Sequence, residues 1–246
     1  MIRVGVLGAK GRMGAQTCAT IEAAGDLDLV ARVDDVHDRE ALTGCDVVVD
    51  FTHPGAVMDN VRWCVEHGLA VVAGTSGFDD TRLDQVREWL AGAGAGRVLV
   101  VPNFSVGAVL MMRFAEQAAP FFDSVEVIEL HHADKADAPS GTAARTASVI
   151  EAARTAAGRG PSPDATVTAA DGARGTVVGG VHVHSVRMAG LVAHQEVLLG
   201  GSGEILTIRH DSLDRASFMP GVLLAVRGIS GLPPGLSVGL DGLLGI

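Results

Sequence analysis

The sequence predicts an α/β protein in two parts, a parallel-sheet domain at the N-terminus and an α+β domain with a mixed or antiparallel sheet after it. Apolar runs alternate with helical patterns over short connections up to about residue 104, and a glycine-rich turn follows the first run. Beyond residue 176, strand-like runs follow one another without a helical pattern between them. Alternating strands and helices imply a parallel sheet with right-handed crossovers, whereas consecutive strands imply antiparallel or mixed pairing.

A strand, a glycine-rich turn, a helix and a second strand open the chain. The apolar run Ile2–Leu7 ends in Gly8-Ala-Lys-Gly-Arg-Met-Gly14, and a helical pattern then extends from Arg12 to Gly25. The second strand, Leu27–Val33, is followed by Asp34 and Asp35. Asp34 lies about twenty residues beyond Gly14, where a dinucleotide-binding unit places the acid that bonds the adenosine ribose. This order predicts a Rossmann-like domain that binds a nicotinamide dinucleotide.

The three glycines have separate physical roles in such a turn. Gly8 permits the tight turn, Gly11 lets the backbone approach the pyrophosphate, and Gly14 brings the helix close to the sheet. Their spacing is Gly-x-x-Gly-x-x-Gly, not the commoner Gly-x-Gly-x-x-Gly, so a tight turn without a ligand is the alternative. An acid near the ribose favours NADH because it repels a 2′-phosphate. The neighbouring cations Lys10, Arg12 and Arg32 offset that repulsion, which leaves use of NADPH open.

Loops at the ends of three further strands are candidates for the nicotinamide half of the cofactor site. Strands are predicted at Asp46–Phe51, Leu69–Ala73 and Arg97–Val101, with helices from about Gly55 to Glu66 and from Thr81 to about Leu90. Thr81 and Asp84 resemble a capping box. Ligands of open parallel sheets bind beyond the carboxyl ends of the strands. The residues expected there are Phe51 and Thr52; Gly74, Thr75 and Ser76; and Val101, Pro102, Asn103 and Phe104.

The second half of the chain predicts a different sheet. Helices are expected over Val106–Phe121 and Thr142–Ala157, and a long exposed loop over Gly158–Thr176. Strands are expected at Val125–Leu130, Val177–Met188, Leu191–Leu199 and Glu204–Arg209, with a turn over residues 200–203, and a last helix at Asp214–Arg227. We therefore expect residues 1–104 and 213–246 to form the dinucleotide-binding domain, with the tail packed on it. Residues 105–212 would form a domain for substrate binding and oligomerisation.

The segment from Glu129 to Thr142 concentrates groups that bind and protonate an anion. His131 and His132 exchange protons near neutrality, and Lys135 supplies a fixed positive charge. The helix that follows offers unpaired backbone N–H groups together with Ser140, Gly141 and Thr142. The alternative is that these are polar side chains at a strand end and an ordinary helix start. The favoured interpretation is a site that holds and protonates a small anion.

Composition excludes several classes of function. The 29 Asp and Glu residues outnumber the 19 Lys and Arg residues, which disfavours nucleic-acid binding, and tyrosine is absent. Cys18, Cys45 and Cys64 lack metal-ligand spacing and predict buried, reduced thiols in a cytoplasmic protein. No apolar run approaches the roughly 18 residues of a membrane helix. His182 and His184 lack the partners of a metal site. We expect neither metal nor membrane nor nucleic acid as a partner.

Taken together, these motifs closely resemble the dihydrodipicolinate reductase family of bacterial lysine and diaminopimelate synthesis, whose enzymes are also called 4-hydroxy-tetrahydrodipicolinate reductases. The lysine in the glycine loop, the short length and the C-terminal Gly-Leu-Asp-Gly-Leu-Leu-Gly are similar to actinobacterial members. Ser76 stands where many relatives have threonine. The resemblance rests on residues 8–14, 50–52, 74–77, 102–107, 129–143, 194–196 and 209–212.

The resemblance implies an NAD(P)H-dependent reduction of 4-hydroxy-tetrahydrodipicolinate to tetrahydrodipicolinate, with hydride transfer and loss of water. It implies that His131 is the catalytic histidine, that Lys135 is a proton donor, and that His132, Gly141 and Thr142 bind the substrate carboxylates. It further implies a homotetramer joined through the second-domain sheets, and two domains that close over the substrate. The implied cofactor contacts are Gly8, Ala9, Lys10, Gly11, Arg12, Met13, Asp34, Gly74, Thr75, Ser76, Val101, Pro102, Asn103 and Phe104.

Two other functions stay open at this point. One is an NAD(P)-dependent reductase of the same fold that acts on another small imine or keto acid, and the other is a nucleotide sensor without catalysis. The sequence also leaves open the choice between NADH and NADPH, the extent of domain closure and the stability of the tetramer. It does not decide whether Arg187, Arg209 or Arg215 contacts the second substrate carboxylate.

Overall fold

The chain divides into two compact units. A computed structural model describes residues 1–34, 36–92, 94 and 96–246, so Asp35 lies outside the described residues. The first unit consists of Met1–Val106 and Arg215–Ile246, and the second of Gly107–Asp214. The cofactor and substrate functions assigned to the two parts remain predictions.

The first unit contains a six-stranded parallel sheet in the order β11-β5-β4-β3-β1-β2, which confirms the predicted sheet type. Its last strand was not predicted, because Gly-Leu-Ser-Val is short and begins with glycine; it pairs with β5 and so extends the sheet at its edge. The strands are β1 (Ile2–Leu7), β2 (Leu27–Val33), β3 (Val47–Asp50), β4 (Ala70–Ala73), β5 (Arg97–Val100) and β11 (Gly235–Val238).

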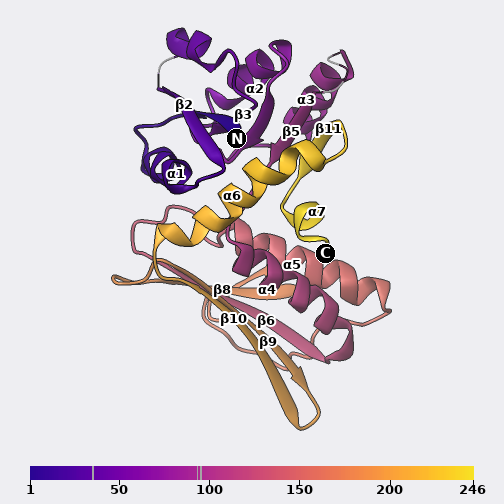
Figure 1. Cartoon of the computed structure of the whole chain (residues 1–246). Coiled ribbons are helices and arrows are strands. Elements are labelled where there is room, and N and C mark those ends of the chain that lie inside the picture. Colours follow the sequence, from indigo (N-terminus) through magenta and orange to yellow (C-terminus); the bar gives the residue numbers. More distant parts are fainter. Residues whose placement is uncertain (35, 93, 95) are drawn as a thin grey trace. The chain divides into compact units, whose positions relative to one another are not determined.

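Helices cover both faces of this sheet, as Figure 1 shows. In β3, Val47 and Val49 pack in the core shared with α1 and α6, while Val48 packs in the core shared with α2 and α3. Burial on both faces accounts for the nearly continuous valine runs in these strands. The helical segments are α1 (Arg12–Ala23), α2 (Val57–Glu66), α3 (Asp80–Gly92), α6 (Met219–Gly228) and α7 (Asp241–Leu244), with short 3₁₀ turns at Val36–Leu42, Arg215–Phe218 and Ile229–Gly231.

The start of α3 corrects one local prediction. Thr81 and Asp84 do not form the cap; instead, the backbone N–H of Arg82 donates to the Asp79 carboxylate at 2.9 Å. An aspartate accepts from the N–H three residues on as readily as a threonine does. The helix therefore begins one residue before the predicted position, at Asp80.

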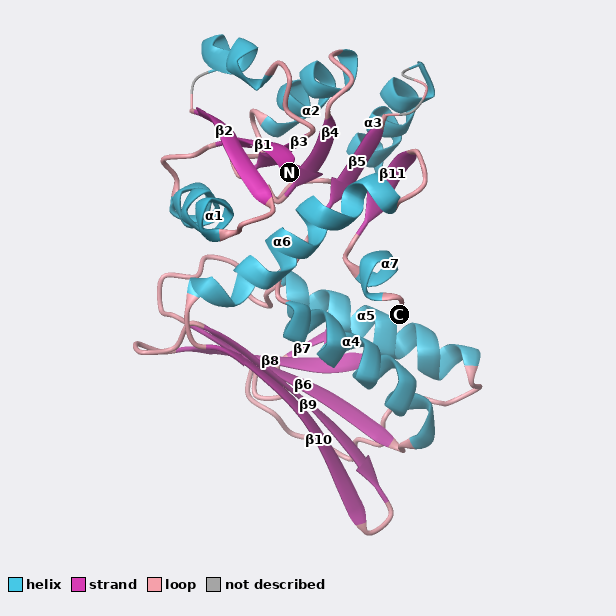
Figure 2. Ribbon diagram, viewed as in Figure 1, coloured by secondary structure: helices cyan, strands magenta, loops and turns pink. Residues whose placement is uncertain are grey.

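The second unit contains a mixed five-stranded sheet in the order β10-β9-β6-β8-β7. Strands β6 and β8 are parallel, and the other neighbours are antiparallel. Helices α4 and α5 lie along one face (Figure 2), where Val127, Val183 and Val197 meet Ala147 and Ile150 in one core. The elements are α4 (Val106–Ala118), a 3₁₀ turn (Ala119–Phe121), β6 (Ser124–His131), α5 (Gly141–Ala156), β7 (Thr176–Val178), β8 (Val181–Arg187), β9 (Ala193–Gly201) and β10 (Glu204–Ser212).

Glycines divide one predicted strand of the second unit into two. Gly179 and Gly180 have φ angles of 57° and 90°, which reverse the chain between β7 and β8. The run predicted as a single strand over Val177–Met188 is therefore a hairpin, because two left-handed residues in succession form a turn. Among the helices of the described residues, none is long and apolar enough to cross a membrane.

Candidate active site

The second unit holds a completely buried carboxylate at the end of β6. Glu129 accepts hydrogen bonds from both terminal nitrogens of Arg187, each at 2.8 Å, and from the backbone N–H of Ser140 at 3.1 Å. The ring Nδ1 of His131 lies 2.5 Å from Oε2 of Glu129. Three separate segments, the strand ends of β6 and β8 and the start of α5, are thus held by one side chain.

These contacts determine the charge states in the cluster. Burial raises the pKa of the Glu129 carboxyl, but hydrogen bonds from Arg187, Ser185 and His131 outweigh burial and bring the pKa to about 2. Burial lowers the pKa of His131, and the neighbouring cations Lys135 and Arg187 lower it further. The Glu129 carboxylate acts in the opposite direction and raises the pKa of His131. The cluster therefore combines a carboxylate that stays ionised with an imidazole poised to exchange a proton.

A lysine and a helix start lie beside this cluster. Lys135 donates to the carboxylate of Asp137 at 2.6 Å. This bond, with help from the backbone N–H of Gly141, lowers the pKa of Asp137. Ser140 is buried and caps α5 through its hydroxyl oxygen, which accepts from the N–H of Ala143 at 3.2 Å. The start of α5 and Lys135 therefore both meet a carboxylate in this structure, that of Asp137.

The other predicted substrate residues are His132, Gly141 and Thr142, which lie next to the residues that bond to Glu129 and Asp137. His132 is half-buried, and its carbonyl accepts from the N–H of Lys135 at 3.2 Å. Gly141 is exposed at the first position of α5, and Thr142 follows it half-buried. Gly141 and Thr142 thus form the start of α5, and His132 is joined to Lys135 through its backbone.

The glycine-rich turn of the first unit lines a separate cavity. A cavity of about 250 Å³ is bounded by Gly8, Gly11, Asp34, Phe51 and Thr52, all predicted cofactor residues, and by Leu7, His53, Ala56 and Asn60. Asp34 accepts from the backbone N–H of Lys10 at 2.7 Å, and the lysine ammonium lies 3.7 Å from its other oxygen. A second cavity of about 420 Å³ lies between Ala9, Lys10, Arg32, Asp34 and Asp38. Asp34 therefore stands between two hollows at the glycine turn.

Two glycines of this turn are required by their surroundings. Gly8 has a φ angle of 77°, in the left-handed region that favours glycine. A Cβ on Gly14 would lie 2.0 Å from the carbonyl oxygen of Gly8, so α1 approaches the backbone of the turn after β1 more closely than any side chain allows. The N-cap residue Gly11 makes no side-chain cap hydrogen bond, and the first N–H groups of a helix have no partner within it, so the start of α1 suits a diphosphate. The residues present fit a nicotinamide dinucleotide.

The loops after β3, β4 and β5 are brought together by three kinds of contact. Asp50 is completely buried and accepts from Thr52, Asn60 and Thr75, with the three side-chain bonds between 2.6 and 2.9 Å. Phe51 and Phe104 have ring centroids 5.4 Å apart, and both rings would contact a Cβ placed on Gly74. The N–H of Val101 bonds to the carbonyl of Ala73. Among the other predicted cofactor residues of these loops, Ser76 and Pro102 are exposed, and the side-chain oxygen of Asn103 accepts from the backbone N–H of Ser105. In the glycine-rich turn, Arg12 is exposed and Met13 is half-buried against the core.

Family models match nearly the whole chain. Residues 2–104 match the model described as dihydrodipicolinate reductase, N-terminus, and residues 107–244 match the model of its C-terminus. The chain belongs to the dihydrodipicolinate reductase family. This membership confirms the resemblance and the predicted enzyme class, an NAD(P)H-dependent 4-hydroxy-tetrahydrodipicolinate reductase of lysine and diaminopimelate biosynthesis.

Relatives of dihydrodipicolinate reductase type cover the chain from end to end. The 4-hydroxy-tetrahydrodipicolinate reductase of Nocardia farcinica is 65% identical over 99% of this chain and 98% of its own length. The enzyme of the same name from Thermobifida fusca is 58% identical over 100% of both chains. The solved structure of dipicolinate-bound dihydrodipicolinate reductase from Paenisporosarcina sp. TG-14 superposes with a TM-score of 0.86, at 34% identity over 98% of this chain and 99% of that one. A probable dehydrogenase from Thermotoga maritima, at 16% identity and a TM-score of 0.59, shares the fold.

Sequence reasoning about this reductase missed three side chains that its geometry places in the sites. Glu129 was named only as the first residue of the predicted anion-binding segment and as part of the family motif, with no role of its own, although it is the centre of the second-unit cluster. Asn60 and His53 line the glycine-turn cavity without having been predicted. Asn60 carried a signal, because it stands within the buried stripe Val57, Val61, Cys64 and Val65 of α2, where a polar residue needs a buried partner.

The three arginines considered for the second carboxylate are in different situations. Arg187 is engaged by Glu129 and by the carbonyl of Asp137. Arg209 is bonded to Glu196 and Asp211, and Arg215 is exposed in the first unit at the start of a 3₁₀ turn. His194, which the family motif includes, is bonded to Asp211 at 2.6 Å. Arg187 thus has its terminal nitrogens committed within the protein.

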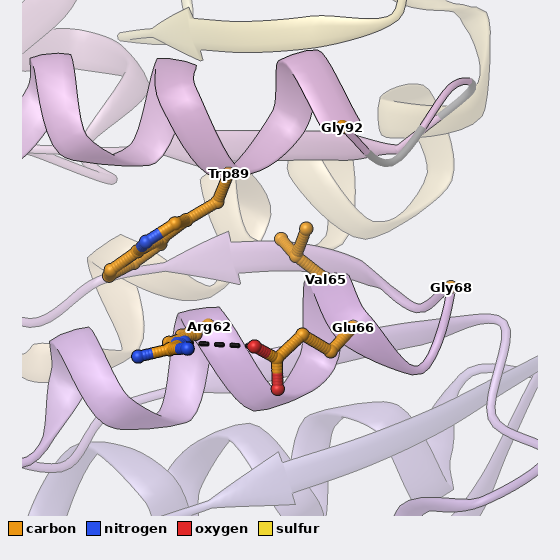
Figure 3. A pocket seen from close by; sticks show the side chains of 6 residues that line it. All are labelled: Arg62, Val65, Glu66, Gly68, Trp89 and Gly92. Atoms are coloured by element: carbon orange, nitrogen blue, oxygen red, sulfur yellow. Dashed lines mark hydrogen bonds and ion pairs between the residues drawn. The ribbon is translucent and has the colours of Figure 1, made fainter.

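Other polar features lie away from these sites. A surface cavity of about 380 Å³ between α2 and α3 is lined by Arg62, Val65, Glu66, Gly68, Trp89 and Gly92, with Arg62 bonded to Glu66 (Figure 3). It contains none of the predicted site residues. Within the described ranges of the chain, no three His, Cys, Asp or Glu side chains gather in a way that could hold a metal ion. The cysteines are buried free thiols.

Proposed function

We propose that this chain reduces 4-hydroxy-tetrahydrodipicolinate with His131 and Lys135 supplying the proton and the start of α5 binding the substrate carboxylates. The observation that carries the proposal is the Glu129 cluster, in which one buried carboxylate holds both His131 and the N–H of Ser140. A proton donor and an anion-binding helix start are thereby kept side by side. Dipicolinate, the ligand named for the solved relative, is a dicarboxylate of the kind such a site would take.

The chemistry of the reaction requires these groups. The substrate loses water to give a conjugated C=C–C=N ring. A nicotinamide cofactor, when bound, would supply the hydride that this ring takes up at the carbon remote from nitrogen. Negative charge then moves toward the imine side of the ring and is quenched by a proton. General acid help of this kind accelerates reactions by about 10²–10⁴. His131 and Lys135 provide it, while His132, Gly141 and Thr142 orient the two carboxylates.

In the first unit, the glycine turn would hold the cofactor diphosphate, and Asp34 would bond the adenosine ribose. The position of Asp34 supports NADH as the preferred cofactor, since Asp34 lines both cavities at the turn and a carboxylate repels a 2′-phosphate. Lys10 lies next to Asp34 and weakens that repulsion, so some use of NADPH is expected. The loops that Asp50 connects would surround the nicotinamide, with Ser76, Pro102 and Asn103 as outer contacts.

Three wider features belong to the same proposal. The enzyme acts in the cytoplasm, where its three buried thiols stay reduced. Its second units assemble into a homotetramer through the sheet face that α4 and α5 leave uncovered. Closure of the two domains over the substrate keeps water away from the hydride.

Replacing His131 by glutamine tests the proposal. Glutamine keeps hydrogen-bonding capacity but cannot donate a proton as an acid, so kcat is expected to fall by about 10²–10⁴. Cofactor binding, measured by fluorescence titration with NADH, is expected to stay within about twofold because that site is built by the first unit. The control is His67→Gln, since His67 lies at the end of α2 and bonds only to Trp63 and its turn. Near-normal turnover of His131→Gln would refute the assignment.

Assays on the same purified protein distinguish the rival functions. A panel of small cyclic imines and keto acids assayed with NADH identifies a reductase of another substrate. A nucleotide sensor would bind NADH without oxidising it in the presence of any of them. The proton-donating cluster around Glu129 favours the reductase, because a sensor has no use for an acid next to an anion-binding helix.

A further inference from the structure

Glu129 is completely buried, yet neither substrate binding nor proton donation accounts for it. We propose that Glu129 is a positioning residue of the reductase, which fixes the tautomer and orientation of His131 and anchors the start of α5. The inference rests on the proposed role of His131 as proton donor. It adds a residue that touches neither substrate nor cofactor but determines which nitrogen of His131 carries the proton to the substrate.

The tautomer follows from the charge of Glu129. Its pKa, about 2, keeps the carboxyl ionised throughout the working range, and an ionised carboxylate only accepts hydrogen bonds. The Nδ1 atom of His131, 2.5 Å away, must therefore carry the hydrogen. Nε2 is left as the nitrogen that gains and loses a proton. An orienting carboxylate behind a catalytic imidazole acts in the same way in other enzymes.

Arg187 explains why a buried glutamate can serve here. Burial alone would favour the neutral acid, but two parallel N–H···O bonds from Arg187 stabilise the carboxylate. Arg187 also bonds to the carbonyl of Asp137, in the loop that carries Lys135. The Glu129–Arg187 pair thus links the loop that carries Lys135 to the sheet. This assigns Arg187 to the support of Glu129 and removes it from the candidates for substrate binding.

The groups that face His131 determine the direction of any pH effect. Glu129 on its own strand raises the pKa of His131, whereas burial, Lys135 in the loop and Arg187 on β8 lower it. Across the sheet, β9 presents Ala193, which is uncharged, and α5 contributes the uncharged Ser140. Removing the charge of Glu129 therefore lowers the pKa of His131. A donor with a lower pKa is deprotonated at lower pH, so activity should be lost earlier as the pH rises.

The test is the pH profile of kcat/KM for Glu129→Gln. At neutral pH we expect a loss of about 10²-fold or more, with NADH affinity within about twofold of wild type. The alkaline limb of the profile should move to lower pH, and the proton NMR signal of the Nδ1 hydrogen in the strong bond should disappear. Binding of pyridine-2,6-dicarboxylate should weaken, because Ser140 loses its anchor. A profile with the wild-type alkaline limb, whatever its height, would overturn the inference.

Glu126 offers a matched control on the same strand. It faces the other side of the sheet and likewise accepts from an arginine and a histidine, Arg174 and His184, but is partly exposed. Glu126→Gln removes the same charge from a similar trio, and it should keep the wild-type alkaline limb. A shift in this variant equal to that of Glu129→Gln would count against a role specific to Glu129.

A double variant protects the test against a failure to fold. Glu129→Gln combined with Arg187→Gln removes both charges of the buried ion pair together, so that neither charge is left buried without its partner, which is the strongly destabilising case. We expect its thermal stability to recover toward wild type while the alkaline limb stays shifted. Recovery of wild-type kcat/KM would show that the charge of Glu129 has no part in positioning. If His131→Gln remains active, the proposed function fails; if only Glu129→Gln remains active, this inference alone fails.

Discussion

Two buried carboxylates, one in each unit, lie at strand ends and differ in how they are satisfied. Glu129 receives its bonds from an arginine, a histidine and a backbone N–H. Asp50 receives its bonds from two threonines and Asn60, all neutral. A carboxylate held by neutral donors fixes the positions of loops, whereas one held between Arg187 and His131 would, on the role proposed for it, also influence proton transfer. Two acidic residues at similar strand ends would therefore serve two purposes.

Lys135 is expected to matter for both affinity and rate. Lys135→Ala removes a charge that would meet a substrate carboxylate and a proton donor, so pyridine-2,6-dicarboxylate should bind about tenfold more weakly and kcat should fall by about 10². Calorimetry and steady-state assays measure the two effects. The control is Asp137→Asn, which removes the carboxylate that Lys135 bonds at 2.6 Å and leaves the lysine charge. Its dicarboxylate affinity should equal or exceed that of wild type. Unchanged affinity in Lys135→Ala would exclude the binding role.

At the scale of elements, the contact between α1 and the glycine-rich turn after β1 depends on the absence of a side chain at Gly14. In Gly14→Ala the new Cβ would meet the Gly8 carbonyl oxygen at 2.0 Å, so the helix must move away from the turn. We expect a loss of about 1–3 kcal/mol in unfolding free energy and weaker NADH binding, measured by urea unfolding and fluorescence titration. Gly25→Ala is the matched control, because no atom lies within 4 Å of its Cβ position. Equal effects of the two changes would contradict this account.

Elements with strong local signals were predicted well from sequence, and the exceptions have physical causes. The strand Leu27–Val33 has its predicted bounds, and the glycine turn before α1 adopts the predicted form, with Gly8 at a φ angle of 77°. The hairpin at Gly179 and Gly180 was missed because apolar residues continue on both sides of it. The strand Gly235–Val238 was missed because it depends on pairing with β5, a contact 135 or more residues away in sequence.

In the candidate site, too, residues with a local signal were predicted and residues that depend on distant contacts were not. Residues with recognisable chemistry, such as His131, Lys135 and Asp34, were selected from local motifs. The importance of Glu129 depends on Arg187, which lies 58 residues away and reaches it only because β6 and β8 pair in parallel. No local pattern contains that pairing. Supporting residues are therefore harder to predict than the residues they support.

At the scale of the whole molecule, the proposed function divides the chemistry between the two units. The glycine turn, Asp34 and the Asp50 network belong to the first unit, and the Glu129 cluster belongs to the second. Cofactor binding and substrate protonation can then be altered separately by single substitutions. This separation is the reason that NADH affinity is a suitable internal control for every second-unit variant proposed above.

The face of the second sheet that α4 and α5 leave uncovered is the expected interface of the proposed tetramer. Leu198 on β9 and Ile205 on β10 lie on this face, and Ile205 is 75% exposed. An apolar side chain so exposed on a sheet suits a protein partner, here a second copy of the chain. The double change Leu198→Glu with Ile205→Glu should place repelling charges there and convert the proposed tetramer to smaller species, measured by size exclusion with light scattering. Phe121→Glu, on a residue 78% exposed beside the helices, should leave the mass unchanged. A tetramer that survives the double change would exclude this face as the interface.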